Sequence, residues 1–116
     1  MAKRRSKYNV APKAERTLDG IVFDSKKEMT RYSELKLLEK AGAITALELQ
    51  PRFDLIVNDV KCGFYKADFA YTAIKIGTGD EIHTWVVEDV KGMKTPLYKL
   101  KKKIVEAIYG IEITEV

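Results

Sequence analysis

Residues 82–116 read IHTWVVEDVKGMKTPLYKLKKKIVEAIYGIEITEV and constrain the architecture more than any other part of the chain. Residues 82–91 are rich in β-branched and aromatic side chains, which favours a strand. Residues 96–109 start with proline after a threonine N-cap and stop before Gly110, which predicts a helix. Residues 111–116 alternate apolar and polar side chains, as a half-buried strand does. Two strands joined by a helix usually lie parallel, through a right-handed crossover.

Both predicted helices carry an apolar face. Upstream, the sequence Ser25-Lys26-Lys27-Glu28 matches a capping box and Gly42 supplies a stop, so a first helix is expected over about 26–41. Its expected apolar side consists of Met29, Tyr32, Leu35 and Leu38, with Leu37 and Ala41 adjoining. The expected apolar stripe of the second helix consists of Leu97, Leu100, Ile104, Ala107 and Ile108.

Between the helices lie three extended stretches: 44–57, which is broken at Gln50-Pro51, then 60–76 and 82–91. Turn residues separate them, with Asn-Asp at 58–59 and Gly-Thr-Gly-Asp at 77–80. This pattern predicts an antiparallel meander. The expected fold class is therefore α/β, with an α+β mixed sheet and the order helix, three-strand meander, helix, strand.

Length and composition fit one domain. The chain has 116 residues, of which 46% are hydrophobic and 33% charged, so a single compact domain is expected over 17–116. The single Cys62 and single His83 exclude a disulfide scaffold and a zinc finger, and both are assigned to packing or surface. No apolar run approaches the ~18 residues of a membrane span. We therefore expect a cytoplasmic protein with no membrane contact, in the host cytoplasm if a phage encodes it.

Positive charge is concentrated in two segments. Residues 3–16 hold six basic side chains against one acid, and residues 91–103 hold six lysines and no acid, which leaves the rest of the chain acidic. Clustered lysine and arginine gain by displacing counterions from a polyanion, so the distribution favours a nucleic-acid partner. The alternative is a solvated tail and a solvated helix face. Residues 1–16 are read as a basic flexible arm that orders only on a partner.

The strand over 82–91 ends in an unusual way. Its apolar run closes with Glu88, Asp89 and Lys91, which a strand buried on both faces would not tolerate. Alternation places Asp89 and Lys91 on one face and Glu88 on the other. A carboxylate beside a lysine suits a site that holds a divalent cation against a phosphate. A partly exposed ion pair at a strand end is the simpler alternative.

Two further acids lie where they need an explanation. Asp68 is expected in the middle of the strand over 60–76, where an unpaired carboxylate is costly, and hairpin pairing can bring it near Asp89. Carboxylates that meet repel each other unless a cation neutralises them. Glu28 can simply serve the capping box, but it also shares a helical face with Tyr32 and Leu35 and can reach a common site.

Together these residues resemble the scattered acid, acid, acid-x-lysine pattern of the PD-(D/E)xK nuclease superfamily. The pattern is carried by Glu28 in FDSKKE, Asp68 in YKADF, and Asp89 with Lys91 in VVEDVKG. With LELQPRFDL and the YGIEITEV ending, the blocks resemble a small phage-encoded endonuclease family related to Holliday junction resolvases. The resemblance covers about 17–116 and implies a restriction-endonuclease-like core. Ala67 replaces a common proline before Asp68, and Gln50 resembles a position near the active site of related nucleases.

The resemblance implies a magnesium- or manganese-dependent endodeoxyribonuclease with no small-molecule cofactor. Asp68 and Asp89 would be the principal metal ligands, with the carbonyl of Val90, and Glu28 would bind directly or through water. Lys91 would orient the attacking water or stabilise charge on the phosphate. The implied substrate is branched DNA, and the implied assembly is a homodimer, because two symmetric cuts need two sites.

The basic segments supply the candidate DNA contacts. On the second helix and just before it, these are Lys94, Thr95, Lys99, Lys102 and Lys103, whereas Lys101 falls nearer the apolar stripe. In the arm they are Lys3, Arg4, Arg5 and Lys7. Three alternatives stay open: a nuclease for ends, flaps or packaging intermediates, a non-catalytic DNA-binding module, and a basic RNA-binding or ribosome-associated protein.

Overall fold

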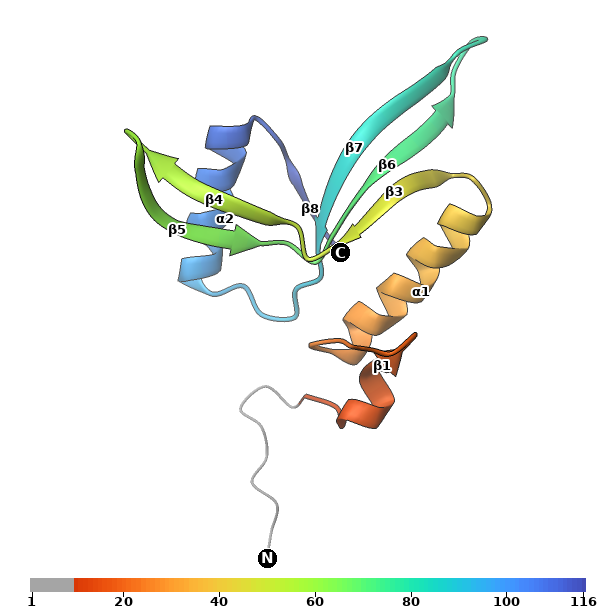
Figure 1. The fold of residues 1–116 in the computed structure, drawn as a ribbon, viewed down its shortest axis with the longest axis horizontal. Coiled ribbons are helices and arrows are strands. Elements are labelled where there is room, and N and C mark those ends of the chain that lie inside the picture. The colour runs from red at the N-terminus through yellow and green to blue at the C-terminus, as the bar shows by residue number, and fades with distance from the viewer. Residues whose placement is uncertain (1–9) are drawn as a thin grey trace, which may run out of the picture.

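The structure is a computed structural model and describes residues 10–116 (Figure 1). Within that range the chain forms two α-helices, eight strands and one 3-10 helix. Their bounds are η1 (Lys13–Arg16), β1 (Thr17–Leu18), β2 (Ile21–Val22), α1 (Lys26–Lys40), β3 (Ile44–Leu49), β4 (Arg52–Val57), β5 (Val60–Lys66), β6 (Phe69–Ile76), β7 (Glu81–Asp89), α2 (Pro96–Tyr109) and β8 (Ile113–Glu115). The predicted mixed α+β class is confirmed.

The central sheet has the strand order β3-β6-β7-β8. β6 pairs antiparallel with β3 and with β7, and the β6–β7 hairpin closes over the predicted turn at 77–80. β8 lies parallel to β7, with Val87 opposite Ile113, after the chain has crossed through α2. The parallel strand pair that the strand–helix–strand pattern predicted is therefore confirmed.

The predicted strand over 60–76 is wrong in one respect, because the chain leaves one sheet and joins another at residues 67–68. β5 pairs only with β4 in a separate two-stranded sheet, whereas β6 belongs to the central sheet. The amide of Ala67 donates to the Pro51 carbonyl (3.0 Å), and the amide of Asp68 donates to the Glu88 carbonyl (3.1 Å). These bonds hold the break, which occurs at an aspartate, a residue that strands disfavour.

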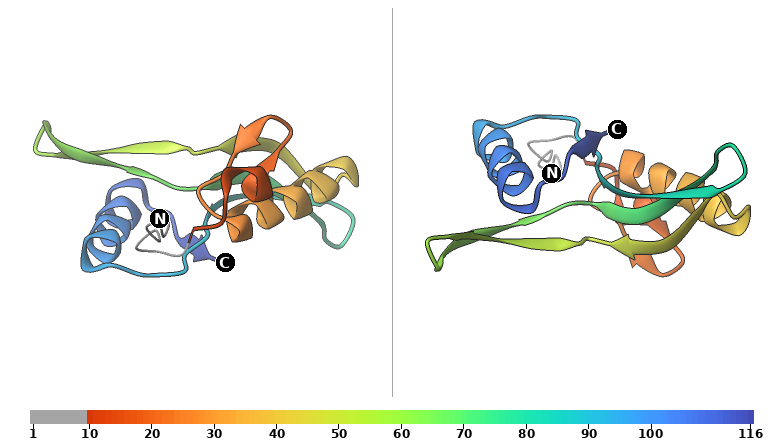
Figure 2. Two further views of the ribbon diagram at one scale, coloured as in Figure 1. Left: turned by 90° about the horizontal axis from the view of Figure 1, so that it is seen from below. Right: turned by 90° about the horizontal axis from the view of Figure 1, so that it is seen from above.

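Helix α1 covers one face of the central sheet (Figure 2). Its N-cap is Ser25, whose side chain accepts a hydrogen bond from the Glu28 amide (3.1 Å). Tyr32 and Leu35 pack into an apolar cluster with sheet residues such as Phe69. The predicted apolar side is only partly right. Leu37 and Leu38, together with Ala41, are exposed, because the sheet lies on the side of Glu28, Tyr32 and Leu35.

Helix α2 packs against the β4–β5 hairpin and β8 (Figure 2). It begins at Thr95, whose hydroxyl accepts from the Tyr98 amide (3.1 Å), and ends at Gly110 in the left-handed conformation (φ 65°). Tyr98 and Val105 are its buried residues. The predicted stripe is not the buried face, since most of its members are exposed: Leu97, Leu100, Ala107 and Ile108.

The N-terminal part of the described chain is a short 3-10 helix followed by a two-residue hairpin. Lys13–Arg16 form η1, within the segment expected to be an arm, and Arg16 Nε donates to the Ala11 carbonyl (2.8 Å). The arm residues Lys3, Arg4, Arg5 and Lys7 lie outside the described residues. Within 10–116, neither helix has the length and apolar character needed to span a bilayer.

Candidate functional site

The three predicted acids lie at the ends of secondary-structure elements, in one region of the molecule. Asp68 lies at the break between β5 and β6, Asp89 is the last residue of β7, and Glu28 is in the first turn of α1. In Figure 1 the two long hairpins diverge from this region. A groove of about 1050 Å³ opens here. Its walls include Glu28, Asp68, Val90, Lys91 and Thr95, and we call it the carboxylate groove.

Asp89 lies under the carboxylate groove and is 0% exposed. The Tyr65 hydroxyl donates a hydrogen bond to its Oδ2. Lys91 Nζ lies 3.2 Å from Oδ1 and forms an ion pair with it but no hydrogen bond. Within 10–116, no other group donates a hydrogen bond to Oδ1. Lys91 is itself held by the Tyr98 ring, 4.8 Å from the centroid. One oxygen of a fully buried carboxylate therefore has only an electrostatic partner.

Asp68 lies against Asp89. Its Oδ2 accepts from the Val90 amide (2.7 Å), and its own carbonyl accepts from the Gln50 amide (2.9 Å). Burial raises the pKa of Asp68 to about 8, with hydrogen bonding to Asp89 and the negative charges of Asp89 and Glu28 adding to the rise. The Val90 amide opposes this, since it stabilises the ionised form. A cation between the carboxylates would relieve the repulsion.

The ionisable side chain of Glu28 is only 5% exposed. Burial, followed by the charges of Asp24 and Asp89, raises the pKa of Glu28 to about 7, and the positive charge of Lys91 partly offsets this. Its amide donates to Ser25 Oγ, which is one half of the capping box. The other half is not formed among residues 10–116, because the Ser25 amide donates no hydrogen bond to the Glu28 carboxyl, which instead lines the carboxylate groove.

Glu88 points to the opposite face of β7, as alternation predicts. Arg31 Nε donates to its Oε1 (2.7 Å) and Arg31 Nη2 to its Oε2 (2.6 Å), and the Tyr71 hydroxyl also donates to Oε2. Glu88 is 1% exposed, and its bonds to Arg31 connect α1 to the sheet. Sequence reasoning did not identify Arg31, although it follows Glu28 by three residues and so shares its helical face.

The donor set fits a magnesium site with few protein ligands. Within 10–116, no three His, Cys, Asp or Glu side chains gather closely enough to hold a metal by themselves. Mg²⁺ usually retains several waters and uses only one or two carboxylates with substrate phosphate oxygens. Asp68 and Asp89 would supply two, and the buried Oδ1 of Asp89, which accepts no hydrogen bond from residues 10–116, is an oxygen that a cation would satisfy.

The predicted DNA contacts are only partly available. Lys94 Nζ pairs with Glu115 (3.3 Å) and Lys102 Nζ with Glu106 (3.2 Å), so these two positive charges are partly neutralised. Lys99 and Lys103 are exposed, and Thr95 lines the carboxylate groove. Gln50 lines a neighbouring hollow of about 200 Å³ together with Glu28 and Asp68.

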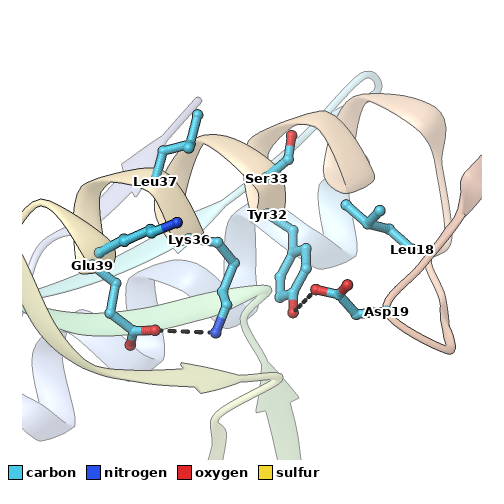
Figure 3. A pocket seen from close by; sticks show the side chains of 8 residues that line it. Leu18, Asp19, Tyr32, Ser33, Lys36, Leu37 and Glu39 are labelled. Carbon is cyan, nitrogen blue, oxygen red and sulfur yellow. Dashed lines mark hydrogen bonds and ion pairs between the residues drawn. The ribbon is translucent and has the colours of Figure 1, made fainter.

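A further hollow, of about 540 Å³, lies beside α1 and the β1–β2 turn (Figure 3). Tyr32 donates to Asp19 (2.9 Å) and Lys36 pairs with Glu39 (3.1 Å), so these polar groups are occupied with each other. None of the predicted site residues within 10–116 lines it.

Comparison with known proteins yields one family. A family model described as "Protein of unknown function (DUF1064)" matches residues 5–114, which is nearly the whole chain. No curated protein and no solved structure matches the chain.

Proposed function

The chain belongs to the DUF1064 family, and we propose that it is a metal-dependent endodeoxyribonuclease that hydrolyses phosphodiester bonds in branched DNA. One observation carries the proposal. Glu28, Asp68 and Lys91 line one groove beside the fully buried Asp89, one oxygen of which accepts no hydrogen bond from the described residues, 10–116. Clustered carboxylates with raised pKa values beside a lysine are characteristic of functional sites. The resemblance to the PD-(D/E)xK superfamily rests on these same residues.

Each residue has a role in the proposed reaction. Asp68 and Asp89 would hold Mg²⁺ or Mn²⁺ together with the Val90 carbonyl, and Glu28 would bind directly or through water. When bound, the ion supplies Lewis acidity to the phosphate and lowers the pKa of the attacking water. Lys91, ion-paired to Asp89, orients that water or neutralises charge that grows on the phosphate oxygens. Tyr65 holds Asp89 in place through its hydroxyl.

The preference for branched DNA comes from the resemblance to the family related to Holliday junction resolvases. The same resemblance supports a homodimer, since paired cuts need two sites. We also propose a cytoplasmic location, in the cytoplasm of the host cell if a phage encodes the protein.

Cleavage of labelled DNA tests the proposal. Four-way junction, flap, single-stranded and linear duplex DNA are incubated with Mg²⁺, with a chelator, and with the Asp89→Ala protein. We expect paired nicks in the junction that disappear in both controls. If flaps or ends are cut and the junction is not, the proposed nuclease activity is supported and the proposed preference for junctions is wrong. Binding without cutting in Mg²⁺ and in Mn²⁺ would contradict the nuclease.

One observation favours a non-catalytic DNA-binding module as the second candidate. Asp68 accepts from the Val90 amide, and Asp89 accepts from Tyr65 and pairs with Lys91, so both acids have partners within the protein, as purely structural acids would. The same cleavage assay separates the two, because a binding module retains its junction affinity after Asp89→Ala and cuts nothing.

A further inference from the structure

A second, smaller hollow adjoins the carboxylate groove on the side of α2. It has a volume of about 230 Å³ and lies between β5 and the start of α2. Phe64, Lys66, Leu97 and Lys101 are among the residues that line it, and we call it the lysine pocket. Lys91 and Thr95 line both hollows. A strand of DNA whose phosphate sits beside Lys91 would therefore continue directly into the lysine pocket.

The lysine pocket is positively charged. Among the residues that the structure describes, three lysines line it and no acidic residue does. Within 10–116, neither Lys66 nor Lys101 forms an ion pair, whereas Lys94 and Lys102 are each paired with a glutamate. Sequence reasoning assigned Lys101 to the neighbourhood of the buried stripe and did not consider Lys66. Unneutralised lysines next to the carboxylates are well placed to hold a phosphate.

The lysine pocket also has an apolar wall that faces solvent. Phe64 is 39% exposed and Leu97 is 61% exposed. The Arg52 guanidinium lies 4.1 Å from the centroid of the Phe64 ring, and Lys101 Nζ lies 5.6 Å from it. These cations orient the ring and leave it inside a positively charged surface. Exposed aromatic rings among cations are the surfaces on which unpaired bases stack.

We propose that the lysine pocket binds an unpaired nucleotide of the DNA strand that is cleaved. Lys66 and Lys101 hold its phosphate, and its base packs against Phe64 and Leu97. In a continuous duplex the base faces are covered by their neighbours, so only the phosphate contact is available. The inference rests on the proposed nuclease function and narrows its substrate class to DNA that is unpaired beside the cut, as at a branch, flap or single strand.

Fluorescence anisotropy tests the proposal with a fluorescein-labelled 20-nucleotide DNA strand, used alone and as a duplex, with Ca²⁺ replacing Mg²⁺. Phe64→Leu keeps the apolar volume but removes the ring, and stacking of about 1–3 kcal/mol per base predicts a roughly tenfold weaker affinity for the single strand. Duplex affinity should change by less than about twofold. Lys66→Gln with Lys101→Gln should weaken both substrates and reduce the salt dependence by about two counterions.

Matched controls lie at the far end of β6. Ile76 is 85% exposed and Lys75 is its neighbour, and neither is part of the site, so Ile76→Ala and Lys75→Gln should leave both affinities unchanged. Thermal unfolding of each variant verifies that it folds. If Phe64→Leu lowers the affinity for the single strand and the duplex equally, or lowers neither, the proposal that the lysine pocket binds an unpaired nucleotide is wrong.

The two proposals fail in different ways. If Phe64→Leu selectively weakens single-strand binding while no DNA is cut in Mg²⁺, the proposed binding of an unpaired nucleotide is supported and the proposed nuclease activity is wrong. If the wild type cuts DNA and Phe64→Leu cuts single-stranded and duplex DNA at the wild-type rates, the proposed nuclease activity is supported and the proposed role of the lysine pocket is wrong.

Discussion

The proposed chemistry depends most on Asp89, because among residues 10–116 one of its oxygens has a hydrogen-bond partner and the other does not. Tyr65 donates to Oδ2, and Lys91 approaches Oδ1 without a hydrogen bond. A fully buried carboxylate is costly unless its charge is compensated. Burial is the main cause of the raised pKa values of the neighbouring Glu28 and Asp68, and the negative charge of Asp89 adds to both.

Replacing Asp89 should therefore remove metal binding. Asp89→Asn keeps the shape and can still accept from Tyr65, but it lacks the negative charge. We expect Mn²⁺ affinity, measured by titration calorimetry, to fall on the order of a hundredfold or more, since a principal ligand is lost. Asp80→Asn, in the exposed β6–β7 turn, is the matched control and should bind as the wild type does. Equal Mn²⁺ affinity in both variants would contradict a metal site at Asp89.

The raised pKa values of Glu28 (about 7) and Asp68 (about 8) also predict a pH dependence of stability. Because both folded-state pKa values exceed the unfolded ones, protonation stabilises the fold. This stabilisation is complete below about pH 4 and is lost as the pH rises through 7 and 8. In a chelator, the unfolding temperature of the wild type should therefore fall relative to that of Asp68→Asn between pH 6 and pH 9. If the unfolding temperatures of the two proteins change in parallel with pH, the pKa of Asp68 is not raised.

Added metal should have the opposite pH dependence, since the ligands bind it only after losing their protons. Stabilisation by Mg²⁺ in thermal unfolding should consequently be larger at pH 8.5 than at pH 6. No Mg²⁺ effect at either pH would argue against these ligands.

At the scale of elements, the contact between Arg31 and Glu88 fixes α1 against β7 and so fixes Glu28 relative to Asp89. Arg31→Met should destabilise the protein by about 3–5 kcal/mol, because it leaves the Glu88 charge buried without its partner. The double variant Arg31→Met with Glu88→Gln should recover much of that loss. Urea unfolding of the single and double variants measures it, and additive losses would show that the pair is not coupled.

The bulge in β3 is a second element-scale feature with a testable energy. The β3–β6 register shifts between Thr45 and Glu48, and Ala46 there has a φ of 56°. A left-handed conformation costs an L-residue about 1–2 kcal/mol, so Ala46→Gly should stabilise the protein by about 1 kcal/mol in urea unfolding. Ala107→Gly, at an exposed position in α2, should instead destabilise it by about 1 kcal/mol. A loss of stability in Ala46→Gly would contradict the backbone conformation at the bulge.

Several elements could be predicted because their signals are local. The caps at Ser25 and Thr95 and the stop at Gly110 define helix ends through neighbouring residues alone. The break at Asp68 could not, because its hydrogen bonds go to Pro51 and Glu88. The buried face of α2 was missed for the same reason: the position of the β4–β5 hairpin, and not helical periodicity, decides that Tyr98 is buried and Leu97 is not.

The candidate site was predictable to a similar extent. Two-residue alternation is sufficient to separate Asp89 from Glu88, and the structure brings Glu28, Asp68 and Lys91 together in the carboxylate groove. Tyr65 and Arg31 were missed, since their roles depend on contacts across 24 and 57 residues of sequence. The pairing of Lys94 and Lys102 with glutamates depends on the position of β8 and on the turn spacing of α2.

At the scale of the whole molecule, an acidic site is surrounded by a chain of net charge +4. The carboxylate groove and the lysine pocket are adjacent, so binding and the proposed cutting would use one continuous surface. The central claim is that four residues from α1, the β5–β6 break and the end of β7 act as one metal-dependent centre.

The most direct test is the initial rate of Mg²⁺-dependent cleavage of a labelled four-way junction, measured for four site variants beside the wild type. Glu28→Gln, Asp68→Asn, Asp89→Asn and Lys91→Met should each lower the rate by about a hundredfold or more, since each removes a proposed ligand or charge. Asp80→Asn and Lys75→Gln, on the distant β6–β7 hairpin, should cut at the wild-type rate. Wild-type rates in the four site variants, or no cleavage by the wild type, would contradict the account.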